Sequence, residues 1–162
     1  MVERKSRFIA IIIILCAALI AIPRLKILFE GDKGRIERII YSAKNATQRE
    51  DLLTCISFIS YDYSDKYGNT RRSLLLAAKQ AFQDYEDIII GIRQLKIDVD
   101  KDTAKAEVQA TGIARKVNRK ETNIFEKDTV KFLIFFKKEE GDWKVVELEF
   151  LEPQDVLPAG II

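Results

Sequence analysis

Hydrophobic and polar positions follow three different patterns along this chain. Residues 8–22 read FIAIIIILCAALIAI, and their only polar side chain is the thiol of Cys16. After Gly31, apolar residues recur every three or four positions, as they do in amphipathic helices. From Ile88 onward, apolar and polar residues alternate, which is the pattern of half-buried strands. The sequence therefore predicts an apolar segment, then three helices, then four strands.

The apolar run predicts a membrane segment over residues 8–29. Residues 8–22 would cover roughly 22 Å as a helix, which is short for a hydrocarbon core of about 30 Å. Apolar side chains resume at Leu25, however, and the basic residues on both flanks can extend their charged ends into water. Because no A-x-A cleavage pattern follows, we expect an uncleaved anchor rather than a cleaved signal peptide or a buried core helix.

The charge of the chain is divided between this segment and the body. Residues 1–26 carry five basic side chains and one acidic one, a net of +4, and the rest carries 22 basic and 24 acidic side chains, a net of −2. An acidic body argues against nucleic-acid binding, which requires a basic face. We expect the short basic tail, residues 1–7, to lie inside a single-pass cytoplasmic (inner) membrane and the soluble domain to lie on its periplasmic side. A count of basic residues on both flanks favours the opposite orientation.

The body begins with three predicted helices. The first has one apolar stripe, and the second begins at Thr47-Gln-Arg-Glu50, which has the spacing of a capping box. The third follows the Gly-Asn turn at Asn69, and Asn69 or Thr70 can cap it. Its apolar positions are Leu74, Leu75, Ala78, Phe82 and Tyr85.

Four strands follow the helices. The alternation changes phase at Arg93-Gln94, which predicts a β-bulge that bends the first strand. Runs of helices followed by runs of strands indicate an α+β fold. We expect an N-terminal transmembrane helix followed by a cone, in which three helices pack on a bent, mainly antiparallel four-stranded sheet. Residues 152–162, which contain two prolines, are expected to form an irregular tail.

Three stretches of the body resemble a known superfamily. They are the helix pair RIERIIYSAKNATQREDLLTCIS, the segment YDYSDKYGN and the ending GDWKVVELEF, which has a Gly-Asp turn before its tryptophan. Over residues 32–151 the chain resembles the nuclear transport factor 2-like superfamily, whose SnoaL-like members have a cystatin-like cone. The resemblance implies a membrane-anchored bacterial member of unknown function, and tethered relatives support a domain outside the cytoplasm. The superfamily includes enzymes, transport factors and secretion-complex subunits, so its fold does not select a function.

The absence of histidine guides the choice among these functions. A chain without histidine has no Ser–His–Asp or Cys–His arrangement and no ordinary proton shuttle near pH 7. We therefore expect a non-catalytic domain, with no cofactor, that binds a protein partner or a small apolar ligand. Two alternatives remain open. One is a small isomerase, dehydratase or hydrolase that uses Asp62 with Tyr41 or Tyr63 for proton transfer. The other is an envelope assembly or secretion-complex subunit.

The cone also predicts two contact regions. A ligand pocket at its mouth is expected to be lined by Tyr41, Asp62, Tyr63, Phe82, Phe132 and Trp143. The sheet has apolar residues on both faces and therefore needs a second cover. We expect a homodimer through the outer face, at Leu133, Phe135 and Val145. The C-terminal tail, with Leu157, Ile161 and Ile162, is the alternative cover.

No metal site is expected. The segment Asp98–Asp102 superficially resembles a calcium loop, but Thr103 replaces the required glycine and Gln109 replaces the required glutamate. A hairpin turn explains this segment better. Cys55 lies on the apolar stripe of the second helix and is expected to be a small buried residue rather than a reactive thiol.

Overall fold

The structure, a computed structural model, describes residues 31–117 and 124–151, with side chains over 31–117 and 129–151. The predicted basic tail (1–7), membrane segment (8–29) and irregular tail (152–162) lie outside this description and remain predictions. Within the described ranges, no helix is long and apolar enough to cross a membrane.

Three helices precede the sheet, as predicted. They are α2 (Asp32–Gln48), α3 (Leu52–Ser57) and α4 (Arg71–Asp84). Thr70 caps α4 in a reciprocal arrangement with Ser73, which fixes the start of that helix.

The predicted start of the second helix was wrong. Thr47 lies in the last turn of α2, where its hydroxyl donates to the Ala43 carbonyl at 2.9 Å. Asp51 caps α3 instead, because its carboxylate accepts from the backbone of Thr54 at 3.1 Å. Glu50 between them has a positive φ of 56°, which ends α2 and turns the chain.

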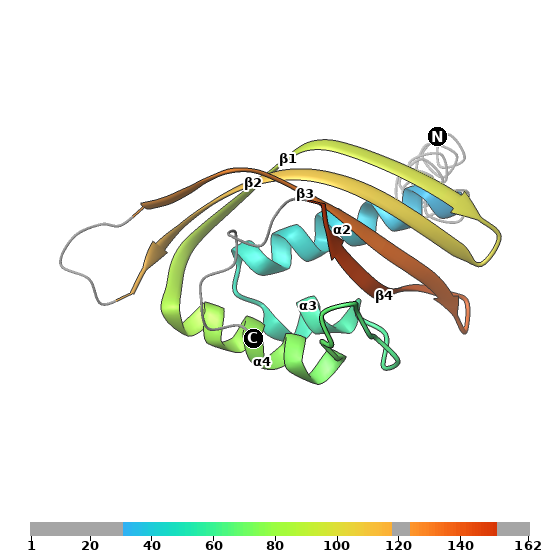
Figure 1. The fold of residues 1–162 in the computed structure, drawn as a ribbon, viewed down its shortest axis with the longest axis horizontal. Coiled ribbons are helices and arrows are strands. Elements are labelled where there is room, and N and C mark those ends of the chain that lie inside the picture. Colours follow the sequence, from blue (N-terminus) through green and yellow to red (C-terminus); the bar gives the residue numbers. More distant parts are fainter. Residues whose placement is uncertain (1–30, 118–123, 152–162) are drawn as a thin grey trace, which may run out of the picture.

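Four antiparallel strands form one sheet in the order β1-β2-β3-β4, which confirms the predicted meander. They are β1 (Tyr85–Asp100), β2 (Thr103–Lys116), β3 (Ile124–Glu139) and β4 (Asp142–Phe150). The register of β1 against β2 shifts between Ile92 and Gln94, so the predicted bulge at Arg93 is confirmed. This bend contributes to the curvature of the sheet over the helices (Figure 1).

Another bulge, in β4, corrects the predicted faces of that strand. Phe135 pairs with Glu147 and Phe136 pairs with Val145, so Val146 has no partner on β3. Strict alternation places Val145 and Leu148 on opposite faces, whereas the bulge turns both toward the helices. Val145, expected at an outer interface, is therefore a core residue.

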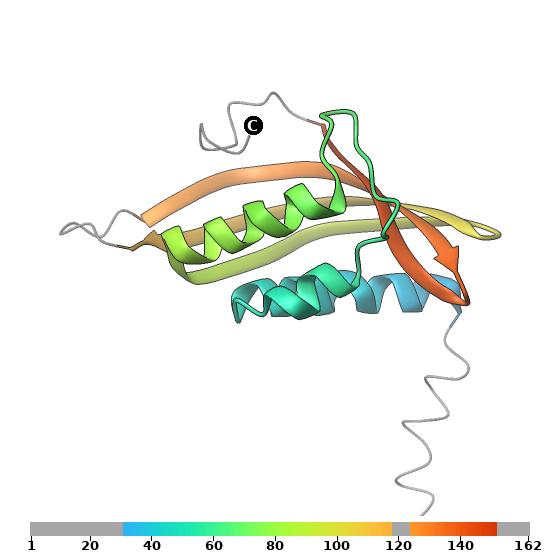
Figure 2. The same ribbon diagram turned by 90° about the horizontal axis from the view of Figure 1, so that it is seen from below.

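The core lies at the end of the cone that α2 covers. Ile36 and Ile40 of α2 join the buried alanines of β2 and the large side chains Phe136 and Trp143. α4 covers the other part of the concave face and has no buried residue (Figures 1 and 2). The cone is thus tightly packed under α2 and loosely packed under α4.

Candidate functional site

The loosely packed side of the cone is an apolar region between α4 and the sheet, which we call the mouth. On α4, Leu74, Ala78 and Phe82 follow helical spacing and share one face, and Leu74 packs against the core. The facing sheet residues, also half-buried, are Ile92, Leu95, Phe132, Leu148 and Phe150.

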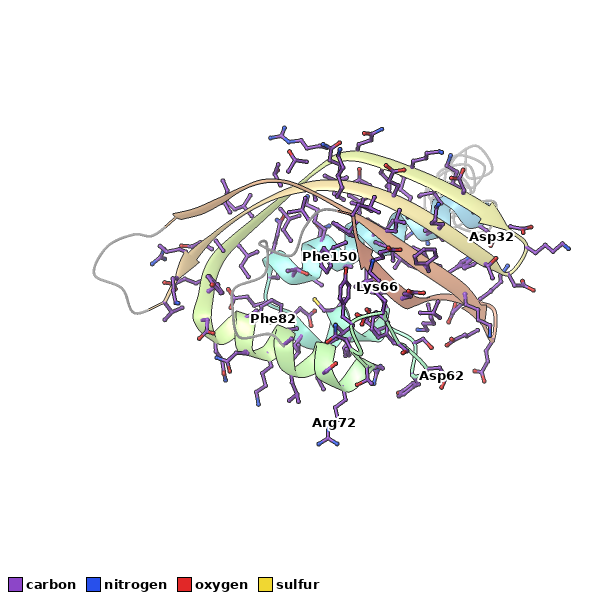
Figure 3. The ribbon with its side chains drawn as sticks, viewed as in Figure 1. Asp32, Asp62, Lys66, Arg72, Phe82 and Phe150 are labelled. Atoms are coloured by element: carbon purple, nitrogen blue, oxygen red, sulfur yellow. The ribbon has the colours of Figure 1, made fainter. Side chains whose placement is uncertain are left out.

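Aromatic rings line the mouth where β4 ends. The ring centroid of Phe150 lies 6.2 Å from that of Phe132 and 6.3 Å from that of Tyr67. Both distances are within the range of favourable aromatic pairs. Phe150 and Phe82 lie between α4 and the sheet in Figure 3, so aromatic side chains approach the mouth from both sides. Half-buried rings of this kind provide contact surface for an apolar group and lose little side-chain conformational entropy on binding it.

The loop at residues 60–70 closes one side of the mouth and is held by Asp65. The Asp65 carboxylate accepts from the Tyr63 hydroxyl at 2.9 Å, from the backbone of Tyr67 and from the backbone and side chain of Asn69. Burial opposes the charge of Asp65, but these hydrogen bonds outweigh burial and keep the pKa of the carboxyl below its ordinary value. The ionised Asp65 carboxylate is therefore a shared hydrogen-bond acceptor that fixes the loop.

Tyr63, a predicted pocket residue, serves the same loop. Its side chain is only 2% exposed, and burial together with the Asp65 carboxylate raises the pKa of its hydroxyl. Ser60, also buried, extends the support by donating to Glu139 at 2.7 Å and accepting from the backbone of Asp62. Tyr63 is thus a fixed neutral side chain rather than a proton donor poised near pH 7.

The acid–base residues of the enzyme alternative do not come together. Asp62 is exposed and points away from the mouth (Figure 3). Tyr41 is 40% exposed on α2, and Tyr63 is committed to Asp65. A general acid or base must lie within hydrogen-bond reach of the atom it serves, and in the described residues these three share no site.

Trp143, another predicted pocket residue, lies at the closed end of the cone. Its indole nitrogen donates to Asp32 at 3.0 Å, and Lys138 contacts the same carboxylate at 3.2 Å. The hydrogen bond from Trp143, followed by that from Lys138, lowers the pKa of Asp32. This cluster joins the first turn of α2 to β3 and β4 and has no connection with the mouth. Of the predicted pocket residues, only Phe82 and Phe132 lie in the mouth.

Two hollows lie away from the mouth. A groove of about 620 Å³ separates α2 and the end of α3 from the β3–β4 turn, and both basic and acidic side chains line it, including Arg35, Lys144 and Asp142. A hollow of about 480 Å³ crosses the outer face of the sheet, and its lining includes Phe135 and Val146. The first is suited to polar contacts, and the second lies on the predicted dimer face.

The described residues show no grouping of three or more metal-ligating side chains. Cys55 is half-buried, and burial raises the pKa of its thiol, which lies 3.6 Å from the Thr47 hydroxyl. A protonated thiol of this kind is a weak nucleophile.

Several mouth residues were not predicted. Tyr67 and Phe150 were missed because their contact joins a loop to the last strand. No local sequence pattern predicts a contact between such distant segments. Leu148 was assigned to the opposite face from Trp143 and Val145, because the bulge at Val146 was not anticipated. The signal was available in the paired valines of WKVVELEF, which interrupt an otherwise alternating strand.

No protein-family model and no curated protein sequence matches this chain. Solved structures do match. One is a protein of unknown function with a cystatin-like fold from Nostoc punctiforme, at 17% identity and a TM-score of 0.60, covering 78% of this chain and 94% of that one. Another is a putative scytalone dehydratase from Novosphingobium aromaticivorans, at 16% identity and a TM-score of 0.62, covering 72% and 80%.

A nuclear transport factor 2-like protein from Cytophaga hutchinsonii matches at 16% identity and a TM-score of 0.58, covering 75% of this chain and 98% of that one. The chain spans only 39% of a further match, Bd1075 from Bdellovibrio bacteriovorus, at 16% identity and a TM-score of 0.57. At these identities the likeness is one of fold. The described residues thus form the α+β cone of the cystatin-like, nuclear transport factor 2-like structures.

Proposed function

We propose that this protein is a membrane-tethered, extracytoplasmic binding domain whose mouth takes a small apolar ligand. The observation that carries the proposal is the half-buried apolar lining between α4 and the sheet. Ligand sites are mostly apolar and concave with few polar groups, and the apolar face of α4, which is only half-buried, has this chemistry. The tether rests on the apolar sequence of residues 8–29.

Binding is favoured over catalysis because of how the polar groups are used. Asp65 and Tyr63 hold the loop, Asp32 holds the closed end, and Asp62 faces solvent. The neighbour named a putative scytalone dehydratase shares the fold at 16% identity, and that likeness supplies no acid–base pair in this chain.

Photolabelling of the full chain in lipid nanodiscs tests the proposal. The probe is a medium-chain fatty acid that carries a diazirine, and the labelled residues are mapped by mass spectrometry. We expect labels on α4 and on the end of β4. Phe82→Ser should reduce labelling at the mouth severalfold, because a polar side chain replaces a large part of the apolar lining.

Leu76→Ser is the matched control. Leu76 lies on the same helix but is 57% exposed, so its substitution should leave the labelling unchanged. Labels confined to the membrane segment, or equal losses in the two variants, would contradict an apolar site in the mouth.

A further inference from the structure

The polar groove beside α2 lies at the closed end of the cone, apart from the mouth. Its volume of about 620 Å³ falls within the range of about 300–1,000 Å³ that is usual for small-molecule sites. α2 forms one wall, the β3–β4 turn and the start of β4 form the other, and the end of α3 completes the lining. The proposed function gives this groove no role.

The two walls of the groove carry opposite charges. On α2, Arg35 and Arg38 are three positions apart and share the face of the helix that lines the groove. On the other wall, Glu140 and Asp142 flank Gly141 in the turn. Glu140 and Gly141 both have positive φ, 52° and 93°, as a two-residue turn of type I′ requires. This tight turn holds the two carboxylates close to each other.

Several of these charges are not used by the fold. Within residues 31–117 and 129–151, the Arg35 guanidinium makes no hydrogen bond, and its charge acts on Asp32 only through space. In the same ranges, Glu140 and Asp142 are exposed and form no ion pair. Lys144, which also lines the groove, donates to a carbonyl at the end of α3 at 2.9 Å. Arg35, Glu140 and Asp142 are therefore available to a ligand.

The shape of the groove is fixed by contacts between its walls. The indole of Trp143 donates to Asp32 at 3.0 Å, which joins the start of α2 to β4. The backbone of Val145 donates to the Phe58 carbonyl at 2.9 Å, which joins the end of α3 to the same strand. The walls thus keep their spacing without a ligand, and this preorganisation lowers the free-energy cost of binding one.

The lining selects a small ligand that carries two opposite charges. A simple anion would meet the carboxylates across the groove, and a simple cation would meet the arginines, whereas a zwitterion presents each charge to the wall of opposite sign. Two arginines one turn apart favour a phosphate over a carboxylate, because phosphate oxygens accept from several N–H donors at once. Ile39 and Phe58 provide apolar contact for the carbon atoms between the charges.

We propose that this groove binds a phosphoethanolamine group, with its phosphate on Arg35 and Arg38 and its ammonium on Glu140 and Asp142. This group has two sources, the free phosphomonoester and the headgroup of a phospholipid. Arg35 is the sixth residue after the predicted membrane segment 8–29, so the lipid source rests on the proposed tether, whereas the free source does not. A bound headgroup would fix the orientation of the domain on the membrane surface.

The fluorescence of Trp143 tests the site, because this residue is the only tryptophan of the chain and lines the groove. The full chain in a nonionic detergent is titrated with soluble phosphoethanolamine, and we expect a saturable change in emission. Inorganic phosphate, ethanolamine and β-alanine, which has a carboxylate in place of the phosphate, should each bind at least about tenfold more weakly, since each loses a charge-assisted contact.

Variants assign each charge of the ligand to its wall. Arg35→Gln should weaken binding about tenfold for both phosphoethanolamine and its N-acetyl derivative, which lacks the ammonium charge. Glu140→Gln should weaken only phosphoethanolamine, so the preference for it over the acetylated probe is lost in this variant and persists in Arg35→Gln. Because this preference is measured within one variant, it does not depend on equal stability of the two proteins.

Two exposed positions outside the groove supply the matched controls. Glu37→Gln lies on α2, and Arg72→Gln lies on α4, where Arg72 points into solvent (Figure 3). Both should leave binding of phosphoethanolamine unchanged. Phe82→Ser, in the mouth, should also leave it unchanged, so the failure of the mouth as a ligand site and the failure of this groove are distinguishable.

The source of the group is decided in the same detergent with dihexanoyl phosphatidylethanolamine. Tighter binding of this lipid than of free phosphoethanolamine would support the headgroup, and the reverse order would support the free phosphomonoester. The absence of a saturable change with either probe would overturn the site. So would equal losses in Arg35→Gln and the two controls, and equally tight binding of β-alanine would overturn the assignment to a phosphate.

Discussion

At the scale of single residues, Asp65 is the polar group on which the edge of the mouth depends. Its carboxylate satisfies donors from three residues within a loop that has little regular structure. Ser60 and Glu139 tie the same loop to β3. Asp65 and Tyr63 in this segment therefore have a structural explanation.

Asp65→Ala is expected to lower the free energy of unfolding by about 1–3 kcal/mol, because the donors in the loop lose their shared acceptor. Urea unfolding of the full chain in a mild detergent measures the change. The control is Asp62→Ala, at an exposed position in the same loop, which should cost less than about 0.5 kcal/mol. Equal losses of unfolding free energy at the two positions would contradict the role of Asp65 as the shared acceptor of the loop.

The pH dependence of stability follows from the same carboxyl and from Asp32. Both have a pKa below the ordinary value of 3.8, so the unfolded chain takes up these protons at a higher pH than the folded chain. Their stabilisation is complete above about pH 5 and is lost as the pH falls through and below 3.8. The difference in unfolding free energy between the natural chain and Asp65→Asn should therefore shrink between about pH 6 and about pH 3. A constant difference across that range would refute this assignment.

At the scale of elements, the two long helices make unequal contributions. α2 buries Ile36 completely in the core, whereas α4 rests on the sheet through half-buried side chains. The inequality arises because the buried alanines of β2 and the large side chains of β3 and β4 complete the core against α2. α4 is thus held less firmly in the core than α2.

Alanine substitutions should reveal the difference between the helices. Ile36→Ala is expected to cost about 2–5 kcal/mol, since it leaves a cavity in a closed core. Leu75→Ala on α4 should cost less than about 1.5 kcal/mol, because that side chain is only half-buried. Denaturant unfolding measures both, and a larger loss at Leu75 would contradict the looser packing of α4.

The elements were predictable to different degrees. The apolar stripe of α2 and the bulge at Arg93 could be predicted from the sequence. The stripe follows the helical period, and the bulge interrupts the alternation of a strand. The bulge at Val146 was missed, because two adjacent valines fit either face of a strand, and only pairing with β3 selects one. The mouth was only partly predicted, through Phe82 and Phe132, since its other members are brought together by contacts between distant segments.

At the scale of the whole molecule, the outer face of the sheet carries the residues of the predicted dimer contact. Leu133 and Phe135 lie on β3 between charged neighbours, where Lys105 and Glu147 flank Phe135 in one row. Two copies related by a two-fold axis can place these rows against each other with opposite charges facing. We propose a homodimer through this face, with Val146 in place of the buried Val145.

Native mass spectrometry of the full chain released from detergent tests this dimer. Leu133→Glu should convert dimer to monomer, because it places like charges at the centre of the contact. Gln109→Glu, on β2 and outside the apolar stripe, should leave the dimer intact. A natural chain that is monomeric at every concentration would exclude the dimer.

The cluster of Asp32, Trp143 and Lys138 has a mechanical consequence. Asp32 is the first residue of α2, so a force applied to the preceding chain arrives at this point. Its carboxylate is held by side chains of β3 and β4, and the load therefore passes into the sheet before the helix can unwind from its end. A domain pulled by its N-terminal side would therefore resist at the closed end of the cone, through Trp143 and Lys138.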